Sequence, residues 1–134
     1  LGSGLFNLPM AEKHKLNVGL GTDVGGGTSF SLLQTLNEAY KVMQLQGARL
    51  SPFKSLYLAT LGGARALRLE DKIGTLQPGT DADFLMLDYN ATPLLSYRLK
   101  QAKTIAETLF VLMTLGDDRT VLQTYAAGQL VHQR

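Results

Sequence analysis

The chain has 134 residues, of which 45% are hydrophobic and 18% charged, and its formal net charge is +2 at pH 7. This composition is typical of a soluble globular domain, and the scattered Lys and Arg residues form no basic stripe that would attract nucleic acid or an anionic membrane. The absence of cysteine excludes disulfides and thiolate ligands, and it agrees with a cytoplasmic location.

Neither a membrane-spanning nor a targeting segment is expected. The longest apolar stretches, such as residues 109–116, are far shorter than the roughly 20 residues that cross a bilayer. The chain begins with Leu1 rather than an initiator Met and carries no signal-peptide core, so we expect it to be a piece of a longer protein.

The first predicted unit is a strand, a glycine-rich loop and a helix. Residues 16–22 alternate Leu and Val with small residues, which predicts a short buried strand ending at Asp23. After three consecutive glycines, Thr28 or Ser29 can cap a helix that ends near Gly47.

A second helix is predicted after Ser51. Ser51 followed by Pro52 is typical of an N-cap and first turn, and the helix is expected to run through residues 53–69. Gly62 and Gly63 are poor residues for a helix interior, so we expect them to permit tight packing or a bend.

The character of the sequence changes between residues 70 and 75, where we place a boundary between two units. Turn residues at 78–81 precede a continuous apolar run at 84–87, which predicts a strand buried on both faces.

The last part of the chain predicts a helix and a hairpin. Thr104 and Glu107 form a capping-box pattern that opens a helix over residues 104–116. The tail alternates apolar and polar residues over 121–132 about a small turn at 127–128, which is the pattern of a β-hairpin.

Asp23 is the most informative candidate for a functional residue. Gly19 and Gly21 fit the start of a dinucleotide-binding fingerprint, but Val24 stands at its sixth position and the acid would repel a pyrophosphate. The glycines at 25–27 could cradle a phosphate, but the expected Gly-Lys-Ser/Thr ending is missing. The alternatives left open are a catalytic or metal-binding acid at the end of a barrel strand, and an acid that caps the following turn.

The other polar candidates have simpler structural interpretations. His14 lies in a polar segment and His132 in the predicted hairpin, so neither is expected to bind a metal. Asp117 and Asp118 precede Arg119, which is typical of a capped turn with an ion pair. The remaining candidates, also interpreted as structural, are Asp81, Asp83, Ser3, Ser29 and Ser51.

Three segments in this order resemble the C-terminal part of metal-dependent amidohydrolases of the nucleobase deaminase group: "VGLGTDVGGGTSFSLLQTLNEAY", "ATLGGARALRLEDKIGTLQPGTDADFLMLD" and "VLQTYAAGQLVHQR". More narrowly, "LLQTLNEAYKVMQLQG" and "FVLMTLGDDRTVLQTYAAGQLV" are similar to the guanine-hydrolysing branch of that group.

The resemblance implies an α/β fold, namely the C-terminal part of a (β/α)₈ amidohydrolase barrel plus the C-terminal strands of its small β-sandwich. Residues 1–72 would be the barrel end, with the eighth strand and the helices that follow it. Residues 73–134 would be the sandwich strands, with an intervening helix at 104–116.

The resemblance also implies a zinc cofactor, a homodimer, and guanine as a small-molecule substrate that is hydrolysed to xanthine and ammonia in purine catabolism. It places Asp23 beside the metal, as the catalytic acid that handles protons for the attacking water. The family's H-x-H pair, its other histidines and its proton-shuttling glutamate belong to segments that precede this sequence. We therefore expect the chain alone neither to bind zinc nor to be active.

Two further functions remain open from the sequence. The chain could belong to another amidohydrolase acting on a different heterocycle, because the residues that read the base are expected upstream. It could also be a non-catalytic oligomerisation module that uses its helices and strands to bind a partner.

Overall fold

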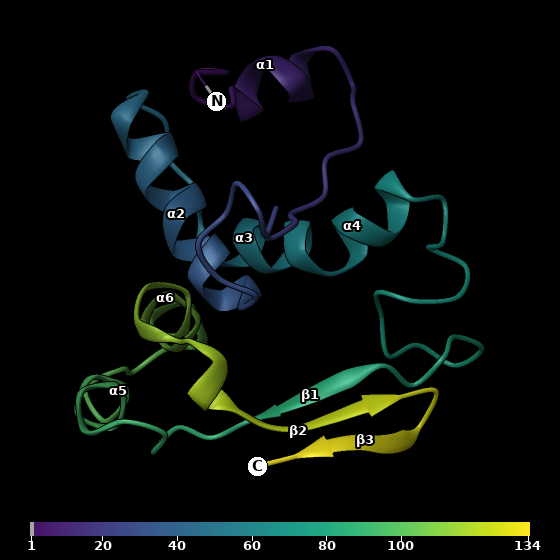
Figure 1. Cartoon of the computed structure of the whole chain (residues 1–134), viewed down its shortest axis with the longest axis vertical. Helices are drawn as coiled ribbons and strands as arrows, with labels where there is room; N and C mark the ends of the chain where they lie inside the picture. Colours follow the sequence, from purple (N-terminus) through teal and green to yellow (C-terminus); the bar gives the residue numbers. More distant parts are fainter. Residues whose placement is uncertain (1) are drawn as a thin grey trace.

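The computed structural model describes residues 2–134, which combine helices with a three-stranded sheet and so confirm the expected mixed class (Figure 1). The elements in chain order are α1 (Leu8–Lys13), α2 (Leu32–Leu45), α3 (Pro52–Ala59), α4 (Leu61–Ala66), β1 (Phe84–Leu87), α5 (Pro93–Leu99), α6 (Ile105–Leu115), the short 3₁₀ helix η1 (Asp118–Thr120), β2 (Val121–Ala126) and β3 (Gln129–Gln133). Figure 1 shows α1 to α4 at one end of the molecule and the sheet at the other. Within residues 2–134, no helix is both long and apolar enough to span a membrane.

Side chains next to the helix ends explain where several helices begin. The Ser51 hydroxyl accepts a hydrogen bond from the Lys54 amide at 3.2 Å, and both halves of the capping box between Thr104 and Glu107 are present. These contacts satisfy amides that have no partner inside the helix, and they confirm the predicted starts of α3 and α6. Helix α2 instead begins after Ser31, slightly later than predicted.

The predicted second helix is broken in two at Thr60. Thr60 has φ −128° and ψ −105°, which ends α3 and starts α4 in a new direction. A methyl group on Gly62 would lie only 2.8 Å from the carbonyl oxygen of Tyr57. The two glycines therefore permit both the bend and the close packing that were predicted from the sequence.

The sheet is antiparallel in the order β1-β2-β3. Phe84 lies opposite Tyr125, and their rings stack with centroids 4.4 Å apart. Ala127 and Gly128 form the predicted hairpin turn with φ values of 48° and 76°, and the Ala127 amide donates to the Asp83 carboxylate at 2.7 Å. The hairpin and the structural interpretation of Asp83 are confirmed.

The prediction that residues 84–87 are buried on both faces is wrong. Leu85 and Met86, whose side chains point to opposite faces of the sheet, are 53% and 45% exposed, so neither face is fully covered at these positions. The two ends of the strand are half-buried, with Phe84 against Tyr125 and Leu87 against a cluster centred on Leu95. A continuous apolar run thus predicts where a strand lies, but it does not show whether other elements cover one face of the strand or both.

The predicted strand at residues 16–22 does not form. This segment is extended, but it lies against helices, and the Leu20 amide donates to the carbonyl oxygen of Leu58 in α3 at 2.9 Å. Val18 and Leu20 pack on buried residues, whereas Leu16 is 62% exposed. Strand formation needs a neighbouring strand that exchanges backbone hydrogen bonds, and the neighbours here are helical.

The buried side chains form three clusters, two of which meet at α6. Met113 of α6 is 1% exposed and packs on α2, while Val111 and Leu112 of the same helix pack on α5. Asn37 of α2 adds a hydrogen bond at 2.8 Å to the carbonyl oxygen of Thr114. The clusters are Leu8, Met43, Leu50 and Leu58; Leu33, Leu36 and Met113; and Leu95, Val111 and Leu112.

Two leucines of α2 test how much the contact with α6 contributes to stability. Leu36 is 1% exposed, whereas Leu45 on the same helix is 74% exposed. We expect Leu36→Ala to lower the free energy of unfolding by about 2–5 kcal/mol, because it leaves a cavity beside Met113. The matched control Leu45→Ala should change it by less than about 0.5 kcal/mol. Equal losses in urea denaturation of the two variants would contradict this packing.

Candidate functional site

Asp23 stands at the start of a tight turn between the extended segment and α2. Its φ is 50°, a left-handed conformation that costs most residues energy and that Asp tolerates better than most. Its backbone carbonyl accepts hydrogen bonds from the amides of Gly26, at 3.0 Å, and Gly27. The turn is therefore closed by the main chain of Asp23.

The glycines after Asp23 are required by the turn geometry. Gly25 has φ +120°, a conformation that side chains rarely adopt. A methyl group on Gly27 would collide with the carbonyl oxygen of Thr22. This agrees with the expectation that the glycines free the backbone to turn into the helix.

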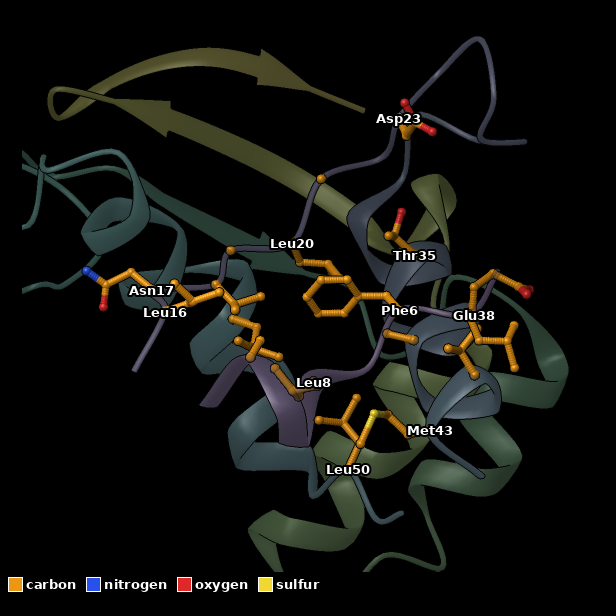
Figure 2. A pocket seen from close by; sticks show the side chains of 18 of the residues that line it. Phe6, Leu8, Leu16, Asn17, Leu20, Asp23, Thr35, Glu38, Met43 and Leu50 are labelled. Atoms are coloured by element: carbon orange, nitrogen blue, oxygen red, sulfur yellow. The ribbon is translucent and has the colours of Figure 1, made fainter. Parts of the chain in front are cut away.

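The carboxylate of Asp23 is not used in closing the turn. Within residues 2–134, no hydrogen bond or ion pair to this carboxylate is seen, and the residue is exposed. Figure 2 shows the carboxylate at the rim of a pocket, directed away from Leu20 and Phe6. The interpretation of Asp23 as an acid whose side chain merely caps the turn is therefore not supported.

The pocket beside Asp23 has a volume of about 740 Å³ and mostly apolar walls. Phe6 and Leu20 lie close together in its middle, and Leu8, Met43 and Leu50 form its floor (Figure 2). The N-terminal segment reaches this place because the side chain of Gln46 donates to the carbonyl oxygen of Phe6 at 2.9 Å. An apolar cavity of this size can enclose a flat molecule, and the Asp23 carboxylate stands at its rim.

Three further polar residues line the pocket, Asn17, Thr35 and Glu38, and none was singled out from the sequence. Thr35 and Glu38 lie on α2, where the spacing of apolar residues gives no signal for them. Glu38 pairs with Lys41 at 2.9 Å, and the Thr35 hydroxyl donates to the carbonyl oxygen of Ser31 at 3.2 Å. Of the two acids that line the pocket, Glu38 is therefore in an ion pair, whereas no ion pair to Asp23 is seen in the described part of the chain.

The described residues do not fit a complete metal site. No group of three or more His, Asp or Glu side chains able to hold a metal occurs within residues 2–134. His14 stands at the end of α1 and His132 lies in β3 opposite Thr124, so neither joins Asp23. A zinc ion needs four ligand positions, of which this chain can supply one at Asp23.

The acidic pair at residues 117–118 has the structural role predicted for it. Asp117 accepts a hydrogen bond from the Arg119 amide at 2.9 Å and opens η1. Its other carboxylate oxygen pairs with the Arg119 guanidinium at 2.5 Å. These hydrogen bonds from Arg119 hold the pKa of the Asp117 carboxyl below its usual range.

Comparison with known proteins defines the class. The amidohydrolase family matches residues 1–131, and the chain belongs to this family. The expected resemblance is thereby confirmed.

Guanine deaminases stand out among the similar proteins. The chain is 56% identical to guanine deaminase of Escherichia coli (strain K12) over all 134 residues, and it superimposes on the solved structure of an E. coli guanine deaminase with a TM-score of 0.96 over 99% of its length. A guanine deaminase from Bradyrhizobium japonicum gives a TM-score of 0.88 at 34% identity, over 99% of this chain and 35% of that one. A guanine deaminase from C. acetobutylicum, solved with guanine bound in its active site, gives a TM-score of 0.79 at 25% identity. The match covers 98% of this chain and 31% of that one. The chain spans 30% of the E. coli sequence and 31% of the E. coli structure.

The ion pair of Asp117 predicts a pH dependence of stability. Because the pKa of Asp117 is lowered on folding, its stabilising contribution is present above the unfolded pKa of about 3.9 and is lost as the pH falls through the folded pKa. We expect Asp117→Asn to be less stable than wild type at pH 7 in urea denaturation, and the difference to narrow below about pH 3. The neighbouring exposed acid provides the control, Asp118→Asn. A difference between Asp117→Asn and wild type that stays constant with pH would contradict the assignment.

Proposed function

We propose that this chain is the carboxyl-terminal part of a guanine deaminase, which hydrolyses guanine to xanthine and ammonia. The observation that carries the proposal is the 56% identity to the E. coli enzyme over all 134 residues. The structure supports it by presenting a free carboxylate, Asp23, on a rigid turn beside an apolar pocket.

The proposed role of Asp23 is to move a proton. In the reaction, the oxygen of water adds to C2 of guanine, the bond from C2 to the exocyclic nitrogen breaks, and the nitrogen leaves as ammonia. A carboxylate at hydrogen-bond distance can accept a proton from the water and return it to the leaving nitrogen.

The amidohydrolase family is generally metal-dependent, and the resemblance implies zinc in the complete enzyme. Since the described residues supply a single candidate ligand at Asp23, the other ligands must come from the rest of the protein. Asp23 is proposed to lie beside that metal.

The proposed architecture of the complete protein is a (β/α)₈ barrel with a small β-sandwich. Residues 1–72 would end the barrel and residues 73–134 would contribute to the sandwich, which the antiparallel strands β1 to β3 support. A homodimer in the cytoplasm is proposed as well.

The test of the site is Asp23→Asn in the full-length protein that contains this chain. Removing the proton acceptor is expected to lower kcat for guanine about 10²- to 10⁴-fold, with the protein still folded. The change is nearly isosteric, and Asp118→Asn serves as the matched control because Asp118 is an exposed acid remote from the pocket. Xanthine formation measured by absorbance would follow the reaction. Wild-type turnover by Asp23→Asn would refute the role.

Substrate choice is tested on the same preparation. Turnover of guanine far above that of other amino-substituted heterocycles supports the proposal. A protein that deaminates a different heterocycle, and loses that activity in Asp23→Asn, would show a different amidohydrolase with the same acid.

The 134-residue chain by itself is expected to show no guanine turnover, because it holds one candidate metal ligand. Adding the upstream part of the protein in trans should restore measurable activity. Turnover by the isolated chain, or none after a stable complex of the two parts has formed, would count against the assignment.

A further inference from the structure

The segment that leads to Asp23 touches helix α4 through two glycines. A methyl group on Gly19 would lie 2.7 Å from Cα of Gly63, 3.4 Å from its amide nitrogen and 3.6 Å from Cβ of Ala66. Backbone meets backbone here, so the absence of a side chain on Gly19 sets the distance between the segment and the helix.

A second anchor follows immediately. The Leu20 amide donates to the carbonyl oxygen of Leu58 in α3 at 2.9 Å, and the Leu20 side chain packs against two of the buried clusters. Together with the contact between Gly19 and Gly63, this hydrogen bond holds the segment against α3 and α4.

The other side of Asp23 is held as well. The main-chain hydrogen bonds from Gly26 and Gly27 to the Asp23 carbonyl close the turn. Asp23 therefore sits between a closed turn and an anchor four residues earlier, and a shift at Gly19 is passed along a short piece of extended backbone.

We propose that Gly19 is a positioning residue for Asp23: its contact with Gly63 sets how far the catalytic carboxylate stands from the substrate. This inference rests on the proposed function. It adds a residue of the pocket wall that acts on Asp23 through the path of the backbone.

The geometry predicts which partner moves when Gly19 is enlarged. Gly63 belongs to α4, whose Gly62 and Ala64 are buried, so the helix backbone is held in place. Optimal carbon–carbon contacts lie at roughly 3.5–4.0 Å, so the extended segment must retreat by about 1 Å. A misplacement of that size at a reacting group can cost about 10²-fold in rate.

The matched control is Gly63→Ala. A methyl group on Gly63 would meet the carbonyl oxygen of Leu58 at 3.6 Å, an ordinary contact, and no atom of Gly19 within 4 Å. The two variants thus add the same methyl group to the two sides of one contact, and only one of them crowds it.

The experiment measures kcat and KM for guanine in the full-length protein, per mole of folded protein as determined by circular dichroism. We expect Gly19→Ala to lower kcat about 10- to 100-fold with KM little changed. Gly63→Ala should keep the wild-type kcat and KM. Expressing kcat per folded protein separates a misplaced carboxylate from a loss of folded enzyme.

The outcomes separate the two proposals. A wild-type protein that does not deaminate guanine overturns the proposed function and this inference with it. An active wild type together with a folded Gly19→Ala of unchanged kcat overturns the inference alone, and so does an equal loss of kcat in Gly63→Ala.

If Gly19→Ala does not fold, the variant Ala66→Val tests the inference instead. Ala66 is exposed, and its Cβ lies on the side of α4 that faces Gly19, so Val crowds the same contact more mildly. A reduced kcat per folded protein with KM little changed supports the inference, and a wild-type kcat overturns it.

Discussion

The structure depends on helix α6, which packs against α2 on one side and against α5 on another. Met113 fills the space between Leu33 and Leu36 of α2, and Val111 and Leu112 of the same helix cover Leu95 of α5. A helix that is apolar around much of its circumference is stable only when it is covered on several sides. Its burial therefore ties the helical end of the molecule to the part that carries the sheet, as Figure 1 shows.

The candidate site is built outward from this core through main-chain contacts. Helix α2, held by α6, forms one wall of the pocket, and α3 and α4 hold the segment that approaches Asp23. Close packing at Gly19 and Gly27 leaves no room for side chains, so the path of the backbone is tightly defined on both sides of the acid. These contacts fix the backbone of Asp23, on which the proton transfer proposed for its carboxylate depends.

Membership of the amidohydrolase family gives this arrangement a chemical context. The chain contributes one acid and an apolar wall, whereas a metal shell needs ligands that no cluster in residues 2–134 provides. The proposed barrel architecture would explain this division, since barrel sites collect residues from the ends of several strands that are far apart in sequence. On that proposal, a C-terminal part carries only a share of the site.

The sequence predicted the features that depend on neighbouring residues. The caps at Ser51 and Thr104, the hairpin turn at Ala127 and the ion pair of Asp117 each join atoms within a few residues, so the local pattern contained all that was needed. Asp23 was singled out because it ends a predicted strand and precedes three glycines, and the family resemblance implied its role.

Tertiary structure alone decided the rest. Whether residues 16–22 form a strand depends on a partner strand, and here α3 supplies the hydrogen-bond acceptor instead. The exposure of Leu85, the pocket wall contributed by Phe6 and the contact between Gly19 and Gly63 likewise arise between segments remote in the chain. Local hydrogen bonds depend on residues that are adjacent in the sequence. Burial and strand pairing depend instead on which distant segments come into contact, and a single sequence does not show those contacts.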